Sequence, residues 1–283
     1  MPLHLLRSVV AVACGLGAFL GASAARADAP AKSSNRSPFE VDPVIEIPVT
    51  LGLGAALGMS RVFSREVLRP ACNPCNPADV NAFDRTVIGW HSSDLRTVSD
   101  VNYALSLTVP FAFSFFDTLL REDCDGWGGM AKDFLVLAET AMAALSTNNF
   151  ICFAVRRPRP LAYDPTHFSE EARTSATNVL SFPSGHTAGS FALATAYSRL
   201  YTMRHSGHWS SVFVWAGSHT AASLVGLGRV FAGEHFWTDV GVAWAMGAAF
   251  GLLVPWLHEK RSPSLRVQVM PFGQGGVMAA AIY

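Results

Sequence analysis

The stretch Phe182–Thr187, FPSGHT, stands immediately before an apolar run, Ala188–Tyr201. Gly185 permits unusual backbone angles and Ser184 is a favoured residue at helix starts, so the sequence predicts a tight turn that leads into a helix. Backbone N–H groups of the first helical turn and the helix dipole together form an anion site, above all for phosphate. His186 stands on that turn, which places an acid or base beside the expected anion.

The overall composition favours a membrane protein. Of 283 residues, 50% are hydrophobic and 15% are charged, whereas soluble domains usually carry about 25% charged residues. The formal net charge is zero, which argues against a nucleic-acid partner. The length suits one domain of generous size, with or without extensions.

The N-terminus has the pattern of a secretory signal. Arg7 precedes the apolar stretch Ser8–Leu20, and the small residues of Ala25–Ala27 fit a cleavage site, so we expect residues 1–27 to be a signal peptide. The expected organisation of the remainder is a leader and cysteine-containing region at 28–96, with 28–43 an exposed leader, a helical core at 97–260 and a tail at 261–283.

Export would place the remaining cysteines in an oxidising compartment. Cys72 and Cys75 form a CxxC pattern without a second such pair, so a zinc site is not expected. A local Cys72–Cys75 disulfide and a pairing with Cys124 are both open.

Hydropathy predicts an all-α fold, a membrane-embedded bundle of about five to six helices. Helices are expected at 97–120, 133–155, 187–204, 209–228 and 237–257. Val240–Leu257 contains no charge and approaches the length of about 18 residues that reads as a bilayer span. Ile45–Phe63 is either a weaker span or an amphipathic helix. Alternation after Leu265 and the glycines of 273–276 predict a short C-terminal β-hairpin.

Two further stretches carry chemically useful side chains. The first is Arg156–Pro160, RRPRP, at the end of an apolar helix, and the second is Gly228–Asp239, GRVFAGEHFWTD. His235 and Asp239 are four positions apart, a spacing that shares one helix face. A carboxylate there would accept the histidine N–H and raise the nucleophilicity of the ring. Arginine forks, a helix N-terminus and two histidines together suit phosphoryl transfer.

The three stretches together resemble the type 2 phosphatidic acid phosphatase superfamily, which also includes bacterial acid phosphatases and vanadium haloperoxidases. The pattern of that superfamily is Lys-x6-Arg-Pro, then Pro-Ser-Gly-His, then Ser-Arg-x5-His-x3-Asp. The second motif is complete at Pro183–His186. The third is complete at Arg229, His235 and Asp239, with Gly228 where serine is usual.

The resemblance implies a role for each matching residue. His235 would attack phosphorus and form a phospho-histidine, and Asp239 would orient it. His186 would protonate the leaving alkoxide and then activate water. The phosphoryl oxygens would be held by Arg159, Arg229, Ser184 and Gly185. Neither a metal nor another cofactor is implied.

The first motif departs from the pattern at one position. It keeps Arg159–Pro160, but Cys152 occupies the position of the lysine, and a neutral thiol does not replace an ammonium beside phosphate. Arg156 or Arg157, within a turn or two of this position, is the expected substitute.

The resulting expectation is a metal-independent phosphatase that hydrolyses phosphate or pyrophosphate esters of membrane lipids. Its expected place is the cell envelope, in the membrane, with the site facing the periplasm. The alternatives are a soluble periplasmic acid phosphatase of small esters and a lipid-binding or scaffold protein that has lost turnover. A vanadate-dependent haloperoxidase is disfavoured by the apolar helices and the absent lysine.

Overall fold

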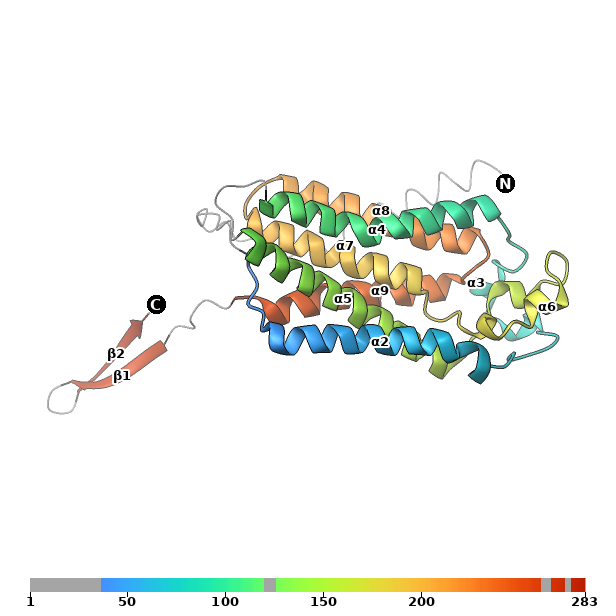
Figure 1. Cartoon of the computed structure of the whole chain (residues 1–283), viewed down its shortest axis with the longest axis horizontal. Helices are drawn as coiled ribbons and strands as arrows, with labels where there is room; N and C mark the ends of the chain where they lie inside the picture. Colours follow the sequence, from blue (N-terminus) through green and yellow to red (C-terminus); the bar gives the residue numbers. More distant parts are fainter. Residues whose placement is uncertain (1–36, 120–125, 261–265, 273–275, 283) are drawn as a thin grey trace.

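The computed structural model describes residues 37–119, 126–260, 266–272 and 276–282. Within these, six long helices form a bundle whose axes follow the long dimension of the molecule (Figure 1). They are α2 (Pro43–Val67), α4 (Ser93–Leu119), α5 (Gly126–Val155), α7 (Gly185–Arg204), α8 (Ser210–Phe231) and α9 (Trp237–His258). The all-α bundle expected from hydropathy is confirmed. The expected signal peptide and Cys124 lie outside the described residues.

Short helices gather at one end of the bundle (Figure 1). They are the 3-10 helices η1 (Pro77–Asp79), η2 (Pro160–Tyr163) and η3 (Ala176–Val179), together with α3 (Ala82–Arg85) and α6 (Glu170–Arg173). Beyond the other end, β1 (Arg266–Phe272) pairs antiparallel with β2 (Gly276–Ile282), with Arg266 opposite Ile282. Figure 1 places these strands away from the bundle, so they do not position the site.

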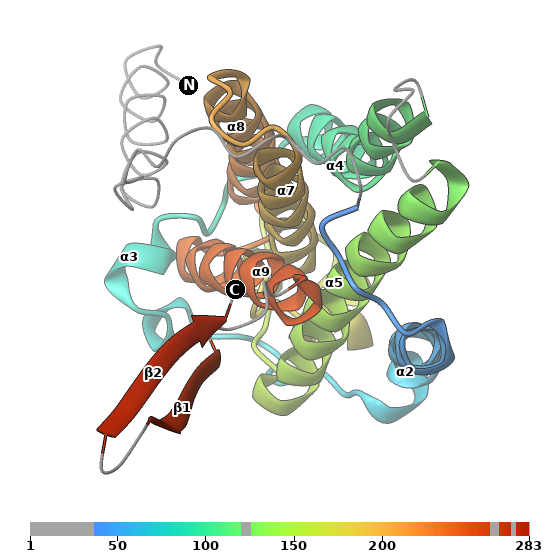
Figure 2. The same cartoon turned by 90° about the vertical axis from the view of Figure 1, so that its left-hand side faces the viewer.

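Helix α7 occupies the centre of the bundle. Seen end-on, it lies among α5, α8 and α9 (Figure 2), and most of its residues are buried. Small residues such as Gly189 and Ala192 let neighbouring helices approach closely, as they do in membrane bundles. The central position of α7 fixes its first turn, which carries His186, against the ends of the surrounding helices.

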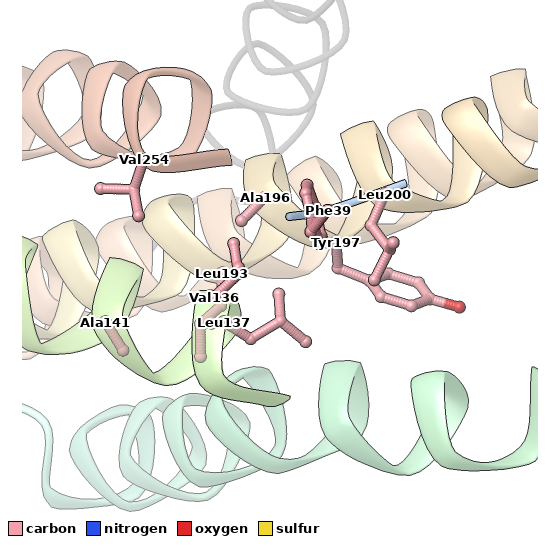
Figure 3. Packing of buried hydrophobic residues seen from close by; sticks show 9 residues of the cluster. All are labelled: Phe39, Val136, Leu137, Ala141, Leu193, Ala196, Tyr197, Leu200 and Val254. Carbon is pink, nitrogen blue, oxygen red and sulfur yellow. The ribbon is translucent and has the colours of Figure 1, made fainter. Parts of the chain in front are cut away.

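The largest apolar cluster ties the N-terminal segment to the bundle. Phe39 is fully buried against residues of α5, α7 and α9 (Figure 3), and Glu40 N donates to His258 O at 2.8 Å. The segment around Phe39 is therefore part of the core and not the exposed leader expected for 28–43. The expected domain boundary at residue 96 falls inside α4.

The outer surface of the bundle is apolar. Among the described residues, three helical stretches are long and apolar enough to cross a membrane: Pro43–Ser64, Gly126–Tyr163 and Trp237–His258. On α2, large side chains including Val44, Leu51 and Val62 are exposed, as expected for a surface that faces lipid. The Ile45–Phe63 stretch, expected to be a weaker span or an amphipathic helix, lies within α2 and belongs to one of these candidate spans. Asn148 and Asn149 point inward instead and are buried, as the cost of polar groups in lipid requires.

The CxxC motif forms a local disulfide. Cys72 and Cys75 are bonded, with their Cα atoms 4.9 Å apart. Asn73 Nδ2 in this loop donates to Glu170 Oε1 of α6 at 3.1 Å, which places the disulfide at the end of the bundle that holds the short helices.

Close packing of α7 on α9 yields a matched pair of substitutions. A Cβ added at Gly251 would lie 2.5 Å from Thr195 Cβ and 2.6 Å from Ala192 O. We expect Gly251→Ala to destabilise the protein by about 1–3 kcal/mol through overpacking. Gly241→Ala in the same helix meets nothing within 4 Å and should be neutral or stabilising by about 0.5–1 kcal/mol. Thermal unfolding in one detergent checks both, and equal melting temperatures would contradict the packing argument.

Candidate active site

The three motifs meet at the end of the bundle where α3 and α6 lie. Backbone bonds from Arg159 N to Asn178 O at 2.8 Å and from Ser181 N to Arg157 O at 3.1 Å hold the first motif beside the turn. A cavity of about 370 Å³ opens here. It is lined by Arg61, Ser64, Tyr103, Leu145, Asn148, Asn149, Cys152, Arg159, Thr177, Leu180, Pro183, Gly185, His186 and His235.

The Pro-Ser-Gly turn begins α7 as the sequence predicts, but its serine has another role. Ser184 occupies the N-cap position, and among the described residues its hydroxyl caps no backbone N–H. That hydroxyl instead accepts from Thr187 Oγ1 at 3.1 Å, and Ser184 N donates to Asp239 O at 3.1 Å. Ser184 therefore builds the turn, whereas Gly185 lines the cavity.

His235 is held by a backbone carbonyl. Its Nδ1 lies 2.8 Å from Ser181 O, and because a carbonyl only accepts, Nδ1 carries the proton and Nε2 keeps its lone pair. Asp239 Oδ2 is 3.7 Å from Nδ1, beyond hydrogen-bond length. The direct His235–Asp239 bond expected from the sequence is thus replaced by one to Ser181. Burial lowers the pKa of the His235 imidazole, which favours the neutral, nucleophilic ring.

Asp239 acts on His235 through the chain around Ser181. Its carboxylate is fully buried and accepts from Ser181 Oγ at 2.6 Å, Phe236 N at 2.9 Å and Arg157 Nη1 at 2.6 Å. These bonds fix the residues on both sides of the imidazole. Asp239 can therefore position His235 only indirectly, through Ser181, whereas the sequence predicts a direct hydrogen bond.

Arg157 is committed to carboxylates and does not supply the cation that Cys152 lacks. Its guanidinium bonds Asp239 Oδ1 at 2.6 Å and Asp84 Oδ2 at 2.8 Å and lies 4.3 Å from the centre of the Phe236 ring. The exposed Arg156 donates from Nε to Phe153 O at 3.2 Å. Neither arginine belongs to the cavity wall that the described residues form.

Glu234 joins the two arginines of the phosphate-binding motifs. Its Oε2 accepts from Arg159 Nη1 at 2.7 Å and from Arg229 Nη2 at 3.3 Å. Burial alone would raise the pKa of the Glu234 carboxyl, but the neighbouring guanidiniums hold that pKa below its ordinary value. Sequence reasoning missed Glu234; the signal was its position next to His235, as the one carboxylate between Arg229 and Asp239.

The two arginines that bond Glu234 differ in exposure to the cavity. Arg159 lines it, whereas Arg229 is almost fully buried behind the site and bonds Asp100 Oδ1 at 2.6 Å. Among the described residues, Arg229 Nε is a buried donor without a hydrogen-bond partner. A buried guanidinium N–H that lacks an acceptor in the protein is suited to donate to an anionic oxygen of a bound substrate.

His186 stands at the mouth of the cavity. Its Nε2 lies 3.4 Å from Asp100 Oδ1, and its ring centroid lies 4.4 Å from that of Tyr103. Both partners come from α4 and were not foreseen from the sequence. Asp100 can accept a proton shared with His186, and Tyr103 limits how the ring turns.

Cys152 is buried in the cavity wall and braces the turn. Its Sγ donates to Pro183 O at 3.4 Å and accepts from Asn148 Nδ2 at 3.5 Å. The position that would hold lysine is therefore filled by an uncharged group that supports the Pro183 carbonyl.

Potential metal ligands gather elsewhere. Within the described ranges, Glu46, Glu139 and His258 offer atoms within 4.8 Å of one another. Glu46 lies in the first turn of α2, fifteen residues before Arg61, which corresponds to about 22 Å along the helix. This cluster is separate from the cavity with the two site histidines.

The paired histidines and the arginine cluster are groups that can bind and transfer a phosphoryl group. Residues 133–263 match the model of the PAP2 superfamily.

Similarity to individual proteins covers different parts of the chain. The chain is 36% identical over 87 residues to a lipid A 1-phosphatase of Porphyromonas gingivalis. These 87 residues are 31% of this chain and 18% of that relative. A transmembrane PAP2-type phosphatidylglycerolphosphate phosphatase from Bacillus subtilis aligns with a TM-score of 0.42 and 22% identity over 76% of this chain and 94% of that one. Aquifex aeolicus LpxE aligns with a TM-score of 0.36 and 20% identity, over 60% of this chain and 90% of that one.

Removal of Arg157 should be costly at neutral pH. Arg157→Ala would leave Asp84 and Asp239 buried without their cation, and we expect a loss of about 3–5 kcal/mol. Arg156→Ala, one residue away and exposed, is the matched control and should change stability little. Thermal unfolding of both variants is the measurement.

The same comparison has a defined pH dependence. Burial acts to raise the pKa of Asp84, but bonds from Arg157 and Thr238 leave it below the ordinary value. The ionised Asp84 carboxylate stabilises the folded protein at pH values above the pKa of about 3.9 that an aspartate has in the unfolded chain. This stabilisation is lost as the pH falls through the lower pKa of Asp84 in the folded protein. The gap between Arg157→Ala and wild type should therefore narrow below about pH 4; a constant gap would contradict the assignment.

Proposed function

We propose that this protein is a phosphatase that hydrolyses a phosphate or pyrophosphate ester of a membrane lipid. The observation that carries the proposal is the Nδ1 bond of His235 to Ser181 O, which leaves Nε2 as an unprotonated nucleophile. His235 shares one cavity with His186, Arg159 and Gly185. The two-histidine arrangement and the guanidiniums are the groups that phosphoryl transfer requires.

In the first step, the phosphoryl oxygens are held by Arg159, Arg229 and the N-terminus of α7 at Gly185. His235 Nε2 attacks phosphorus, a P–N bond forms, and the bond from phosphorus to the ester oxygen breaks. His186 gives its proton to that oxygen, so the lipid alcohol leaves neutral. Asp100 supports the protonated form of His186 before transfer.

In the second step, water replaces the alcohol. His186, now neutral, accepts a proton from the water as its oxygen attacks phosphorus. The P–N bond breaks, inorganic phosphate forms and His235 is restored, with its Nδ1–H still donating to Ser181 O. Charge is stabilised throughout by arginines and backbone donors, so the reaction is proposed to need no metal.

A lipid substrate is favoured by what adjoins the cavity. Arg61 and Ser64 of α2 lie in the cavity wall, while Met59, Val62 and Phe63 of the same helix are exposed. An ester phosphate can therefore reach the cavity while its acyl chains stay in the surrounding bilayer. A soluble phosphatase of small esters would gain nothing from this exposed apolar surface.

The site is proposed to face the periplasm. The Cys72–Cys75 disulfide is joined to α6 through Asn73 and Glu170, at the same end of the bundle as the cavity. Structural disulfides persist in oxidising compartments, so this end belongs outside the cytoplasm.

Substitution of the nucleophile tests the enzyme proposal. Phosphate release from lipid phosphates in detergent micelles should fall to background in His235→Ala, because no other group can form the phospho-enzyme. His208→Ala, an exposed loop histidine, should retain wild-type rates, and a chelator should leave wild-type release unchanged. Equal release by wild type and His235→Ala would favour a binding or scaffold protein.

The role of His186 predicts a dependence on the leaving group. His186→Ala should lower kcat for a lipid alkoxide by about 10²–10⁴-fold, the usual contribution of general acid catalysis. An aryl phosphate with an acidic phenol needs less proton donation, so its formation of phospho-enzyme should fall far less. Burst kinetics with both substrates measures this step, and equal losses would assign His186 to binding instead.

A further inference from the structure

The arginines of the motifs are already paired with carboxylates before any substrate enters. Arg159 and Arg229 are the cations of the motifs, but Glu234 pairs with both and Asp100 pairs with Arg229. Cys152 adds no charge. A phosphate ester carries about 1.5 to 2 negative charges near neutral pH, so its binding calls for a cation that is not already neutralised.

Arg61 is such a cation. It lines the cavity together with Cys152, Arg159 and His186. Among the described residues, no carboxylate forms an ion pair with its guanidinium. The side chain lines the cavity and is exposed, so an arriving ester can reach it.

The backbone of Arg61 is fixed against the helix that carries Cys152. Ser146 Oγ of α5 donates to Leu53 O of α2 at 2.9 Å, and Asn149 Nδ2 of α5 donates to Ser60 Oγ. Asn149 precedes Cys152 by less than one helical turn, and Ser60 adjoins Arg61. These contacts hold the start of the Arg61 side chain beside the last turns of α5.

We propose that Arg61 of α2 binds the phosphoryl oxygens of the substrate and replaces the cation that Cys152 does not provide. The inference rests on the proposed phosphatase function and adds a residue outside the matched range 133–263. A guanidinium fits this position because its planar fork can bind two phosphoryl oxygens together. Because α2 faces lipid, the same residue would direct the phosphate of a membrane ester into the cavity.

Charge substitution at Arg61 is the first test, with kcat and KM measured on one lipid phosphate in micelles. Arg61→Ala should lower kcat/KM by about 10²-fold, the usual effect of one lost donor to a developing oxyanion. Arg61→Lys should recover part of this because the charge is kept. Arg69→Ala, which removes an exposed arginine that does not belong to the described cavity wall, should stay within twofold of wild type.

Relocation of the charge is the second test. Cys152→Lys combined with Arg61→Ala should raise kcat/KM at least tenfold above that of Arg61→Ala alone. Cys152→Ala combined with Arg61→Ala should leave kcat/KM as low as in Arg61→Ala alone. Inorganic phosphate as a competitive inhibitor gives an independent readout: its inhibition constant should rise about tenfold in Arg61→Ala and fall again with Cys152→Lys.

The outcomes separate the two proposals. If wild type releases phosphate and His235→Ala does not, the phosphatase proposal stands. Wild-type kinetics in Arg61→Ala would then overturn the role of Arg61 alone. A loss that neither Arg61→Lys nor Cys152→Lys reduces would also overturn it, because the effect would not be one of charge. If wild type releases no more phosphate than His235→Ala, the phosphatase proposal itself fails.

Discussion

The buried carboxylate of Asp239 is the constraint on which the site depends. A carboxylate without solvent is strongly unfavourable unless it is paired and hydrogen-bonded, and Asp239 meets this demand with partners from three segments. Arg157 comes from the chain after α5, Ser181 from the turn before α7, and Phe236 from the start of α9. Since the main-chain oxygen of Asp239 also accepts from Ser184 N, the ends of three helices are fixed relative to one another. The imidazole of His235 inherits its orientation from this arrangement through Ser181 O.

Hydropathy was sufficient to predict the helical bundle, because apolar length is what a bilayer selects. It also located most helix ends to within one or two residues, whereas the starts of α4 and α5 and the end of α8 lie three to seven residues from the expected positions. The motifs were sufficient to predict that His186, His235, Arg159 and Gly185 would share one cavity. The direct bond between His235 and Asp239 was wrong for a specific reason. A four-residue spacing places two side chains on one face only within a helix, and α9 begins at Trp237. His235 lies in the preceding loop, where its ring meets a carbonyl of another segment instead.

The position of Arg156 and Arg157 outside the cavity wall has a similar origin. Arg156 and Arg157 follow Cys152 closely in sequence, and a continued helix would have kept them near the thiol. Arg156 has a φ of 52°, a left-handed conformation that ends α5, and the chain then turns Arg157 toward Asp84. Arg61 is distant in sequence and lies on a helix that no motif marks. Its place in the cavity follows from the packing of α2 on α5, which depends on contacts such as Ser146 to Leu53 that a linear pattern does not encode. The same holds for Phe39, whose burial makes the N-terminal segment part of the core.

Glu234 gives the site its rigidity before substrate arrives. Two guanidiniums held close together repel one another, and a shared carboxylate makes that arrangement stable in the empty protein. Its cost is that the carboxylate also weakens the attraction of the arginines for phosphate. A site of this kind gains preorganised donors, and it then needs an additional, uncommitted charge to draw the anion in. A lysine beside the cavity is one solution. In this chain the cavity contains a thiol at that position and an exposed arginine from a lipid-facing helix, so rigidity and attraction are assigned to different elements of the fold.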